Sequence, residues 1–236
     1  MRDNAGQGST VTAVMAHRGA SRAEAENTVA AFLRAGRMGA QAVELDVRRT
    51  CDGVLVVHHN PHLADGRLIA GTARADLPAA VPTLGEALDA CAGMWVNVEI
   101  KNDPDEPDFD PDDVIADETV AHLLARHEDD RWLISSFRLE TVDRCHELAP
   151  HIRTAWLCSA VPEGTAPLMV AKGHSAVHPW VGLLTRDVVE SCHAVGVQVN
   201  TWTCDDPARM RELLDWGVDG ICTNVPDVAL GVIADR

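Results

Sequence analysis

The chain has 236 residues, of which 46% are hydrophobic and 24% are charged, and this composition excludes a disordered chain and a fibrous repeat. Acidic residues outnumber basic ones, 36 against 20, and the formal charge of -16 would repel nucleic-acid phosphates, so no nucleic-acid partner is expected. No run of eighteen apolar residues occurs, and residues 1–10 lack the pattern of a signal peptide. With seven scattered cysteines typical of reduced thiols, the sequence indicates a cytoplasmic protein without stable membrane insertion.

Short β-rich runs alternate with helical patterns along the whole chain. The candidate strands are residues 11–17, 42–47, 95–101, 132–135, 154–157, 176–178, 197–202 and 220–223. A helical stretch follows each strand, and the clearest are 28–38, 84–91, 114–127, 139–148, 186–194 and 207–216. Strict alternation implies parallel pairing, and eight units of roughly 30 residues fit a (β/α)8 TIM barrel. A doubly wound sheet is the alternative, but the first strand ends in His17-Arg18-Gly19 rather than a glycine-rich phosphate turn.

We therefore predict a single α/β domain over residues 1–236, interrupted by a small insertion at about 51–83 after the second strand. Asp52-Gly53 is a hairpin signal, and the run after it reads as an extra strand that ends near His58 and His59. The rest of the insertion has the Gly, Pro and Asp content of an irregular loop.

A second irregular region, residues 103–118, follows the third predicted strand and should overhang the barrel mouth. It holds nine carboxylates in sixteen residues and is expected to be a loop until a helix begins near Asp112. One interpretation is a solvated loop. A sharper hypothesis is that Asp105, Glu106 and Asp108 favour substrates with a cationic alcohol.

Charged residues also occupy alternate positions on two predicted strands. Side chains two apart on a strand share a face, so Glu44 and Asp46 point the same way, as do Glu99 and Lys101. If these faces line the barrel near its C-terminal end, three carboxylates and one ammonium converge beside His17. Three carboxylates suit one hard divalent cation, Mg²⁺ or Ca²⁺, whose charge removes their mutual repulsion. An internal ion-pair network that includes Lys101, with Arg48 or Arg49, is the alternative.

Histidines at the ends of strands are candidate proton carriers, because imidazole titrates near neutral pH. His17 closes the first strand. His58 and His59 end the extra strand, and alternation allows only one of them to face the barrel mouth. We expect the histidines of the helical stretches to lie on the surface.

Taken in order, these motifs resemble those of the glycerophosphodiester phosphodiesterases. The resemblance runs from Ala16 to Asp227 and rests on His17-Arg18-Gly19, Ala25-Glu26-Asn27-Thr28, Glu44-Leu45-Asp46, Asp52-Gly53 to His59-Asn60, Glu99-Ile100-Lys101, Trp202-Thr203, and residues 217–226.

The resemblance implies hydrolysis of a small glycerophosphodiester to glycerol 3-phosphate and an alcohol. It also implies roles for individual residues. His17 and His59 would form an acid–base pair, and Glu44, Asp46 and Glu99 would bind one divalent cation. Arg18 and Lys101 would hold the phosphate, Trp202 would line the glycerol pocket, and Glu26, Asn27 and Asn60 would support them.

Three positions depart from the family pattern. Ala25 replaces a proline, and Asn60 and Asn224 replace aspartates. Asn60 leaves His59 without a neighbouring negative charge, whereas Asn224 is still a residue type that supports turns. A different metal-assisted hydrolase or isomerase on the same fold, and a non-catalytic barrel that binds a phosphodiester, are the competing interpretations. The alcohol group, the choice of ion and the oligomeric state stay open.

Overall fold

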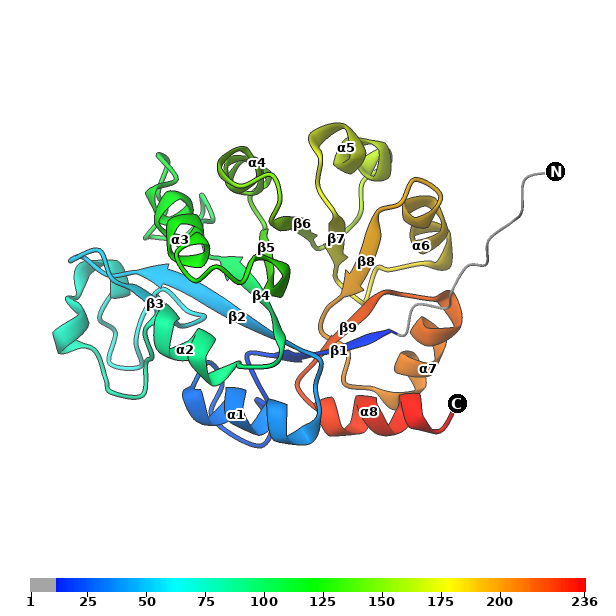
Figure 1. The fold of residues 1–236 in the computed structure, drawn as a ribbon, viewed down its shortest axis with the longest axis horizontal. Helices are drawn as coiled ribbons and strands as arrows, with labels where there is room; N and C mark the ends of the chain where they lie inside the picture. The colour runs from blue at the N-terminus through cyan, green and yellow to red at the C-terminus, as the bar shows by residue number, and fades with distance from the viewer. Residues whose placement is uncertain (1–11) are drawn as a thin grey trace.

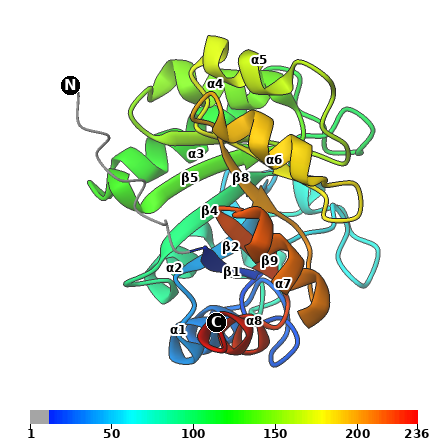
Figure 2. The same cartoon turned by 90° about the vertical axis from the view of Figure 1, so that its right-hand side faces the viewer.

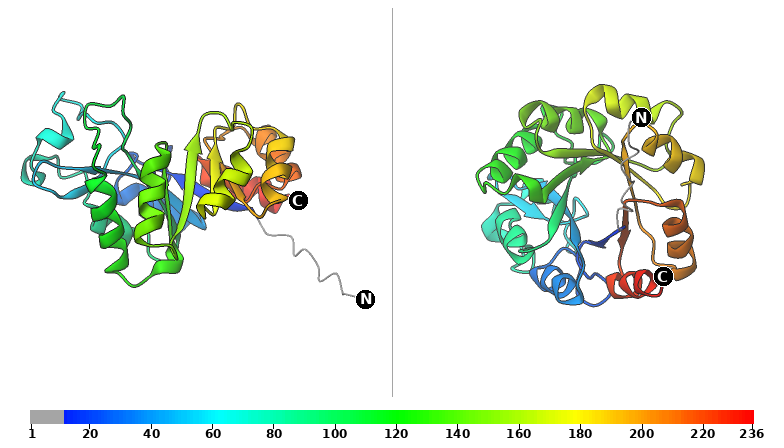
Figure 3. Two further views of the ribbon diagram at one scale, coloured as in Figure 1. Left: turned by 90° about the horizontal axis from the view of Figure 1, so that it is seen from above. Right: turned by 45° about the vertical axis from the view of Figure 1, so that its right-hand side comes forward.

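A ring of parallel strands forms the centre of the protein in the computed structural model, which describes residues 12–236. The eight strands follow the order β1-β9-β8-β7-β6-β5-β4-β2, and β1 also pairs with β2, which closes the ring (Figure 3, right). They are β1 (Ala13–His17), β2 (Ala42–Arg49), β4 (Trp95–Ile100), β5 (Trp132–Ser136), β6 (Arg153–Cys158), β7 (Ala176–Pro179), β8 (Gln198–Thr201) and β9 (Gly220–Thr223). The chain is therefore the predicted TIM barrel and not a doubly wound sheet.

Helices surround the ring on its outside (Figure 1). They are α1 (Val29–Met38), α2 (Leu84–Ala90), α3 (Val114–Leu124), α4 (Leu139–Leu148), α5 (Thr165–Lys172), α6 (Arg186–His193), α7 (Pro207–Trp216) and α8 (Pro226–Ala234). Threonine hydroxyls cap the start of α1, α2 and α6, and prolines open α7 and α8, which are the expected signals for helix starts. The last helix packs beside the first, so the layer of helices also closes (Figure 2).

The predicted insertion leaves the barrel between β2 and α2 (Figure 1). It begins with β3 (Leu55–Val57), which pairs antiparallel with β2, and continues through two short 3-10 turns at Ile69–Gly71 and Arg74–Asp76. A small apolar cluster of its own holds it together, formed by Val56, Leu63, Ile69, Leu77 and Val81. The backbone amide of His58 donates to the carbonyl of Asp46 at 2.9 Å, so the end of β3 is fixed beside the site-bearing strand.

Apolar side chains fill the space between strands and helices and the lower part of the barrel. Inside the barrel they form two small clusters, one of Met15, Ala42 and Cys222 and one of Leu133, Ala155 and Ala176. Above them, towards the C-terminal ends of the strands, the inward positions are polar. The fold therefore places its buried charges at one end.

Some predicted boundaries differ from the structure. β1 begins at Ala13, and Val11 lies outside the described residues; β4 ends at Ile100, so Lys101 is the first residue of the following loop. α3 ends at Leu124, three residues before the predicted end. The sequence patterns gave no ranges for α5 and α8. Within residues 12–236, no helix combines the length and apolar character needed to cross a bilayer.

Candidate active site

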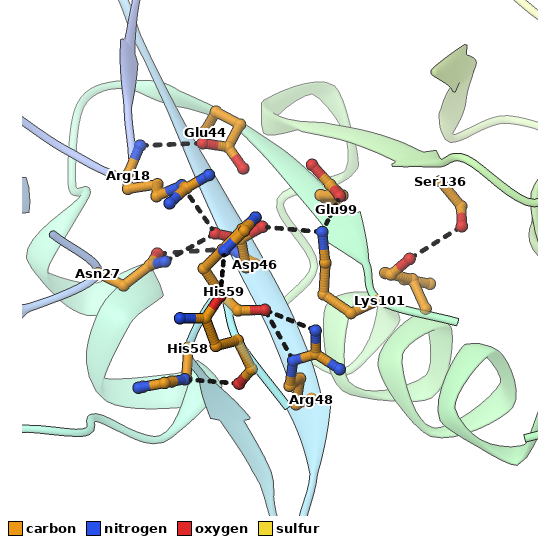
Figure 4. Close-up of polar contacts among 12 residues, drawn as sticks. Arg18, Asn27, Glu44, Asp46, Arg48, His58, His59, Glu99, Lys101 and Ser136 are labelled. Atoms are coloured by element: carbon orange, nitrogen blue, oxygen red, sulfur yellow. Dashed lines mark hydrogen bonds and ion pairs between the residues drawn. The ribbon is translucent and has the colours of Figure 1, made fainter. Parts of the chain in front are cut away.

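A cavity opens at the C-terminal end of the strands and contains about 440 Å³ of empty space, part of it open to solvent. Seven residues predicted from the sequence line it: His17, Arg18, Glu44, His59, Glu99, Lys101 and Trp202. The other lining residues are Met15, Asn97, Phe137, Leu157, His178, Asn200 and Cys222. Of the remaining predicted residues, Asp46 lies beside Glu44 and Glu99, and Asn27 donates to Asp46 (Figure 4). Glu26 accepts from Arg18, and Asn60 contacts the ring of His59.

Three buried carboxylates meet beside the cavity. Glu44 and Asp46 come from β2, and Asp46 lies opposite Glu99 of β4 in the strand register. One oxygen from each carboxylate lies within 4.8 Å of the others, and the side chains of all three are buried. Among the described residues, Oε1 of Glu44 and Oδ1 of Asp46 accept no hydrogen bond. Clustered carboxylate oxygens that accept no hydrogen bond fit a hard divalent cation.

The electrostatics of the triad also fit a cation. Burial, with repulsion from Asp46 and Glu99, raises the pKa of Glu44 well above its usual value. Burial also raises the pKa of Glu99, although Lys101 partly opposes this effect. Burial alone would raise the pKa of Asp46, but Lys101 and Arg18 lower it overall. The raised pKa values of Glu44 and Glu99 show that ionising all three carboxylates together is unfavourable without a further positive charge.

Arg18 and Lys101 face the triad from opposite sides (Figure 4). The guanidinium of Arg18 lies 3.3 Å from Asp46 and 3.0 Å from Glu26, and its backbone amide donates to Glu44 at 2.9 Å. Lys101 Nζ lies 2.8 Å from Glu99 and 3.7 Å from Asp46. Both cations are mostly buried at the edge of the cavity, where an anionic group would meet them.

The loop after β1 has an unusual backbone that directs these groups. Arg18 and Asn27 have positive φ angles of 56° and 55°, and Asn27 donates from Nδ2 to Asp46 at 2.7 Å. Gly19 also has a positive φ, and a Cβ there would lie 2.7 Å from Ala31 at the start of α1. The His-Arg-Gly motif therefore combines a loop that packs closely on a helix with two side chains at the cavity.

The two predicted histidines reach the cavity from different elements. Nδ1 of His17 lies 2.7 Å from Oδ1 of Asn224, and its Nε2 lies 3.9 Å from Glu44. Nδ1 of His59 lies 2.9 Å from Oδ1 of Asn60. His58 does not line the cavity, and its Nδ1 contacts the backbone carbonyl of Asn60 instead. The structure thus places at the cavity His59, the histidine implied by the family resemblance, and not His58.

Burial lowers the pKa of both imidazoles. For His17, Arg18 adds to this effect, while the contact with Asn224 opposes it. For His59, the attraction of Asp46 opposes burial, and Lys101 and Arg18 add to it. Both rings are therefore held towards their neutral form near neutral pH.

An aromatic pair covers one wall of the cavity. Phe137 and Trp202 meet edge to face, with ring centroids 5.4 Å apart, and Lys101 Nζ lies 5.8 Å from the centroid of Phe137. Trp202 Nε1 donates to the carbonyl of His178 at 2.8 Å, which fixes the indole. This side of the cavity is therefore an apolar surface, and the hydrogen bond of the indole holds Trp202 in place.

The acidic loop follows Lys101 in the chain but contributes no residue to the cavity lining, and much of its charge is already paired. Arg48 is fully buried and its guanidinium lies 2.8 Å from Glu106 and 2.6 Å from Asp108. The same group donates to the carbonyl of His59 at 2.9 and 2.5 Å. Two of the three carboxylates proposed to attract a cationic alcohol therefore anchor the loop. The Lys101 part of the alternative ion-pair network is present, since Lys101 pairs with Glu99 and Asp46. Within the described residues the two arginines pair elsewhere, Arg48 with Glu106 and Asp108 and Arg49 with Glu118.

Sequence reasoning missed several polar residues at the site. Asn97 precedes Glu99 by two positions on β4, and Asn200 precedes Trp202 by two at β8, so strand alternation contained the signal for both. Asn224 was expected only to support a turn, yet its side chain contacts His17. No local pattern marks Asp205, which binds Asn224 from the loop after β8.

Comparisons with known proteins agree with this geometry. The model of the glycerophosphoryl diester phosphodiesterase family matches residues 17–228. A glycerophosphodiester phosphodiesterase of Caldanaerobacter subterraneus subsp. tengcongensis is 31% identical, over 94% of this chain and 98% of the relative.

Two solved structures show the same fold. A phosphodiesterase of Oleispira antarctica, in complex with the product sn-glycerol-3-phosphate, superposes with a TM-score of 0.84 at 27% identity, covering 95% of this chain and 97% of the other. A glycerophosphodiester phosphodiesterase of Parabacteroides distasonis superposes with a TM-score of 0.85 at 26% identity, covering 97% and 99%. The chain belongs to the glycerophosphoryl diester phosphodiesterase family and is a phosphoric diester hydrolase.

Proposed function

We propose that the protein, acting as one domain over residues 1–236, hydrolyses small glycerophosphodiesters to glycerol 3-phosphate and an alcohol. The observation that carries this proposal is the meeting of a buried carboxylate triad, two cations and two histidines at one cavity. The product named for the Oleispira antarctica structure supports the choice of glycerol 3-phosphate as the product here.

One Mg²⁺ or Ca²⁺ would bind to Glu44, Asp46 and Glu99. These side chains offer only oxygen ligands, which argues against zinc. The bound cation would offset the carboxylate charge and polarise a phosphoryl oxygen. With that cation, Arg18 and Lys101 give the site a net charge of about +1, and protonation of one histidine raises it to about +2, which favours a diester anion even in an acidic protein.

The chain's own residues would bind the substrate and move protons. Arg18 and Lys101 would hold the phosphate, and Trp202 would pack against the glycerol part. Water that attacks phosphorus must lose a proton, and the departing alcohol oxygen must gain one. We assign the first transfer to His17, because its Nδ1 is engaged by Asn224 and its Nε2 is left for the cavity. His59 would supply the proton to the alcohol.

A chelator experiment tests the metal part of this proposal. Release of glycerol 3-phosphate from glycerophosphocholine should stop in excess EDTA and return with Mg²⁺ or Ca²⁺, and EGTA should separate the two ions. Calorimetry should detect binding of that ion to the parent protein but not to Glu44→Gln. The control Glu140→Gln changes an exposed carboxylate on α4 and should bind the ion normally. Full activity in excess EDTA would refute the proposal.

A further inference from the structure

The position of the proton on the His17 ring depends on which way the side-chain amide of Asn224 points. Oδ1 of Asn224 lies 2.7 Å from Nδ1 of His17. If the amide oxygen faces the ring, Nδ1 must carry the proton; if the NH₂ faces it, Nδ1 must accept and the proton moves to Nε2. The two arrangements have opposite consequences, because only the first leaves a lone pair on Nε2.

Asp205 removes this ambiguity. Its Oδ2 lies 2.7 Å from Nδ2 of Asn224, and its Oδ1 accepts from the backbone amide of Asn224 at 2.8 Å and the hydroxyl of Thr223 at 2.9 Å. An ionised carboxylate can only accept hydrogen bonds, so the NH₂ of Asn224 must face Asp205. The oxygen then faces His17 and also accepts from Ser21 at 2.9 Å.

The environment of Asp205 supports its ionised form. Burial alone would raise the pKa of this carboxyl group, but the hydrogen bonds from Asn224 and Thr223 lower it overall. Because hydrogen bonds in a chain polarise one another, a charged acceptor at one end of the amide strengthens acceptance by its oxygen at the other.

We propose that Asp205 is a positioning residue that acts through Asn224 to hold His17 with its proton on Nδ1 and its Nε2 directed to the cavity. This inference deepens the proposed role of His17 and rests on it. In the family pattern an aspartate stands at position 224. Here an amide contacts the imidazole, and the carboxylate stands one side chain further away.

The tautomer of His17 can be observed directly by ¹⁵N NMR of the metal-loaded protein at a pH above the imidazole titration. The His17 signals are assigned by their loss in His17→Ala. The parent protein should show the proton on Nδ1. In Asp205→Asn the amide pair loses its fixed direction, so a mixture with the Nε2–H form should appear. Turnover, kcat, should fall by roughly 10- to 100-fold with little change in KM.

Two further variants separate positioning from general damage. The exchange Asp205→Asn/Asn224→Asp places the carboxylate beside His17, and it should restore the Nδ1–H form and most of the turnover. Asp206→Asn removes the neighbouring carboxylate, which caps α7, and should leave the tautomer and kcat unchanged.

The proposal is overturned if His17 of the parent protein carries its proton on Nε2, or if Asp205→Asn keeps the parent tautomer. If Asp205→Asn does not fold, the test rests on the His17 tautomer in the parent protein and in the exchange variant. The exchange variant keeps one amide and one carboxylate in the pair. The NMR result does not depend on activity. A parent protein that holds the Nδ1–H form but releases no glycerol 3-phosphate would refute the proposed function alone.

Discussion

The two histidines of the site are supported by regions that are built differently. His17 ends a strand inside the closed barrel, and its ring contacts Asn224, which is itself bound by Asp205. His59 follows the short strand of the insertion, and within the described part of the chain the only hydrogen bond of its ring is to its exposed neighbour Asn60. One ring is therefore oriented by a side-chain network and the other by an adjacent residue at the surface.

The backbone of His59, in contrast, is firmly held. Arg48 is fully buried on β2 and donates twice to the carbonyl of His59 while it pairs with Glu106 and Asp108. One guanidinium thus ties the end of the insertion to the acidic loop. Contacts within the barrel thus orient the ring of His17, and by our proposal its proton, whereas the contacts of the insertion hold the backbone of His59 and leave the orientation of its ring to Asn60.

The largest expected effect is on turnover. His17→Ala and His59→Ala should each lower kcat for glycerophosphocholine by roughly 10²–10⁴-fold, because each removes a general acid or base. His58→Ala is the matched control, since this neighbouring imidazole does not line the cavity.

Steady-state kinetics on the three variants check this prediction. Near-normal turnover in His59→Ala together with loss of turnover in His58→Ala would show that His58, and not His59, transfers the proton. Equal losses in all three variants would indicate damage to the insertion rather than loss of a proton carrier.

Arg48 and Arg49 give a comparison of stability between adjacent arginines. Arg48→Met leaves the buried carboxylate of Asp108 and the His59 carbonyl without their partner and should lower the free energy of unfolding by about 3–5 kcal/mol. Arg49→Met breaks a half-exposed pair with Glu118 and should cost about 1 kcal/mol or less.

Urea denaturation of both variants measures the difference. If the two substitutions cost the same, Arg48 does not anchor the two loops in the manner described.

The fold was predictable because period-two strands and period-3.6 helices alternate along the chain, and each pattern reflects which side is buried. Ends of elements were less certain because local turns decide them. After α3, for example, His127 adopts a positive φ of 55°, and the helical pattern extends into this turn although the helix has ended. The extra strand was found because Asp52-Gly53 is a strong turn signal.

The site was predictable where alternate positions on one strand share a face, as with Glu44 and Asp46. It was not predictable where the contacts depend on closure of the barrel. Asn224 is 207 residues from His17 in the chain, and only the pairing of β1 with β9 brings them together. Arg48 is similar, since its partners Glu106 and Asp108 lie 58 and 60 residues away in an irregular loop.

The smallest expected effect concerns the support of the His59 ring. Burial lowers the pKa of His59, and Asn60 carries no charge to oppose that effect. Asn60→Asp should raise the pKa, because a nearby carboxylate stabilises the imidazolium. If His59 donates its proton to the alcohol, activity requires the protonated ring and falls as pH rises through its pKa. The alkaline limb of the pH–rate profile should therefore move to higher pH, while kcat at the optimum changes little. A profile that stays in place would show that residue 60 does not influence the ring, whereas movement of the acid limb would show that His59 accepts a proton instead.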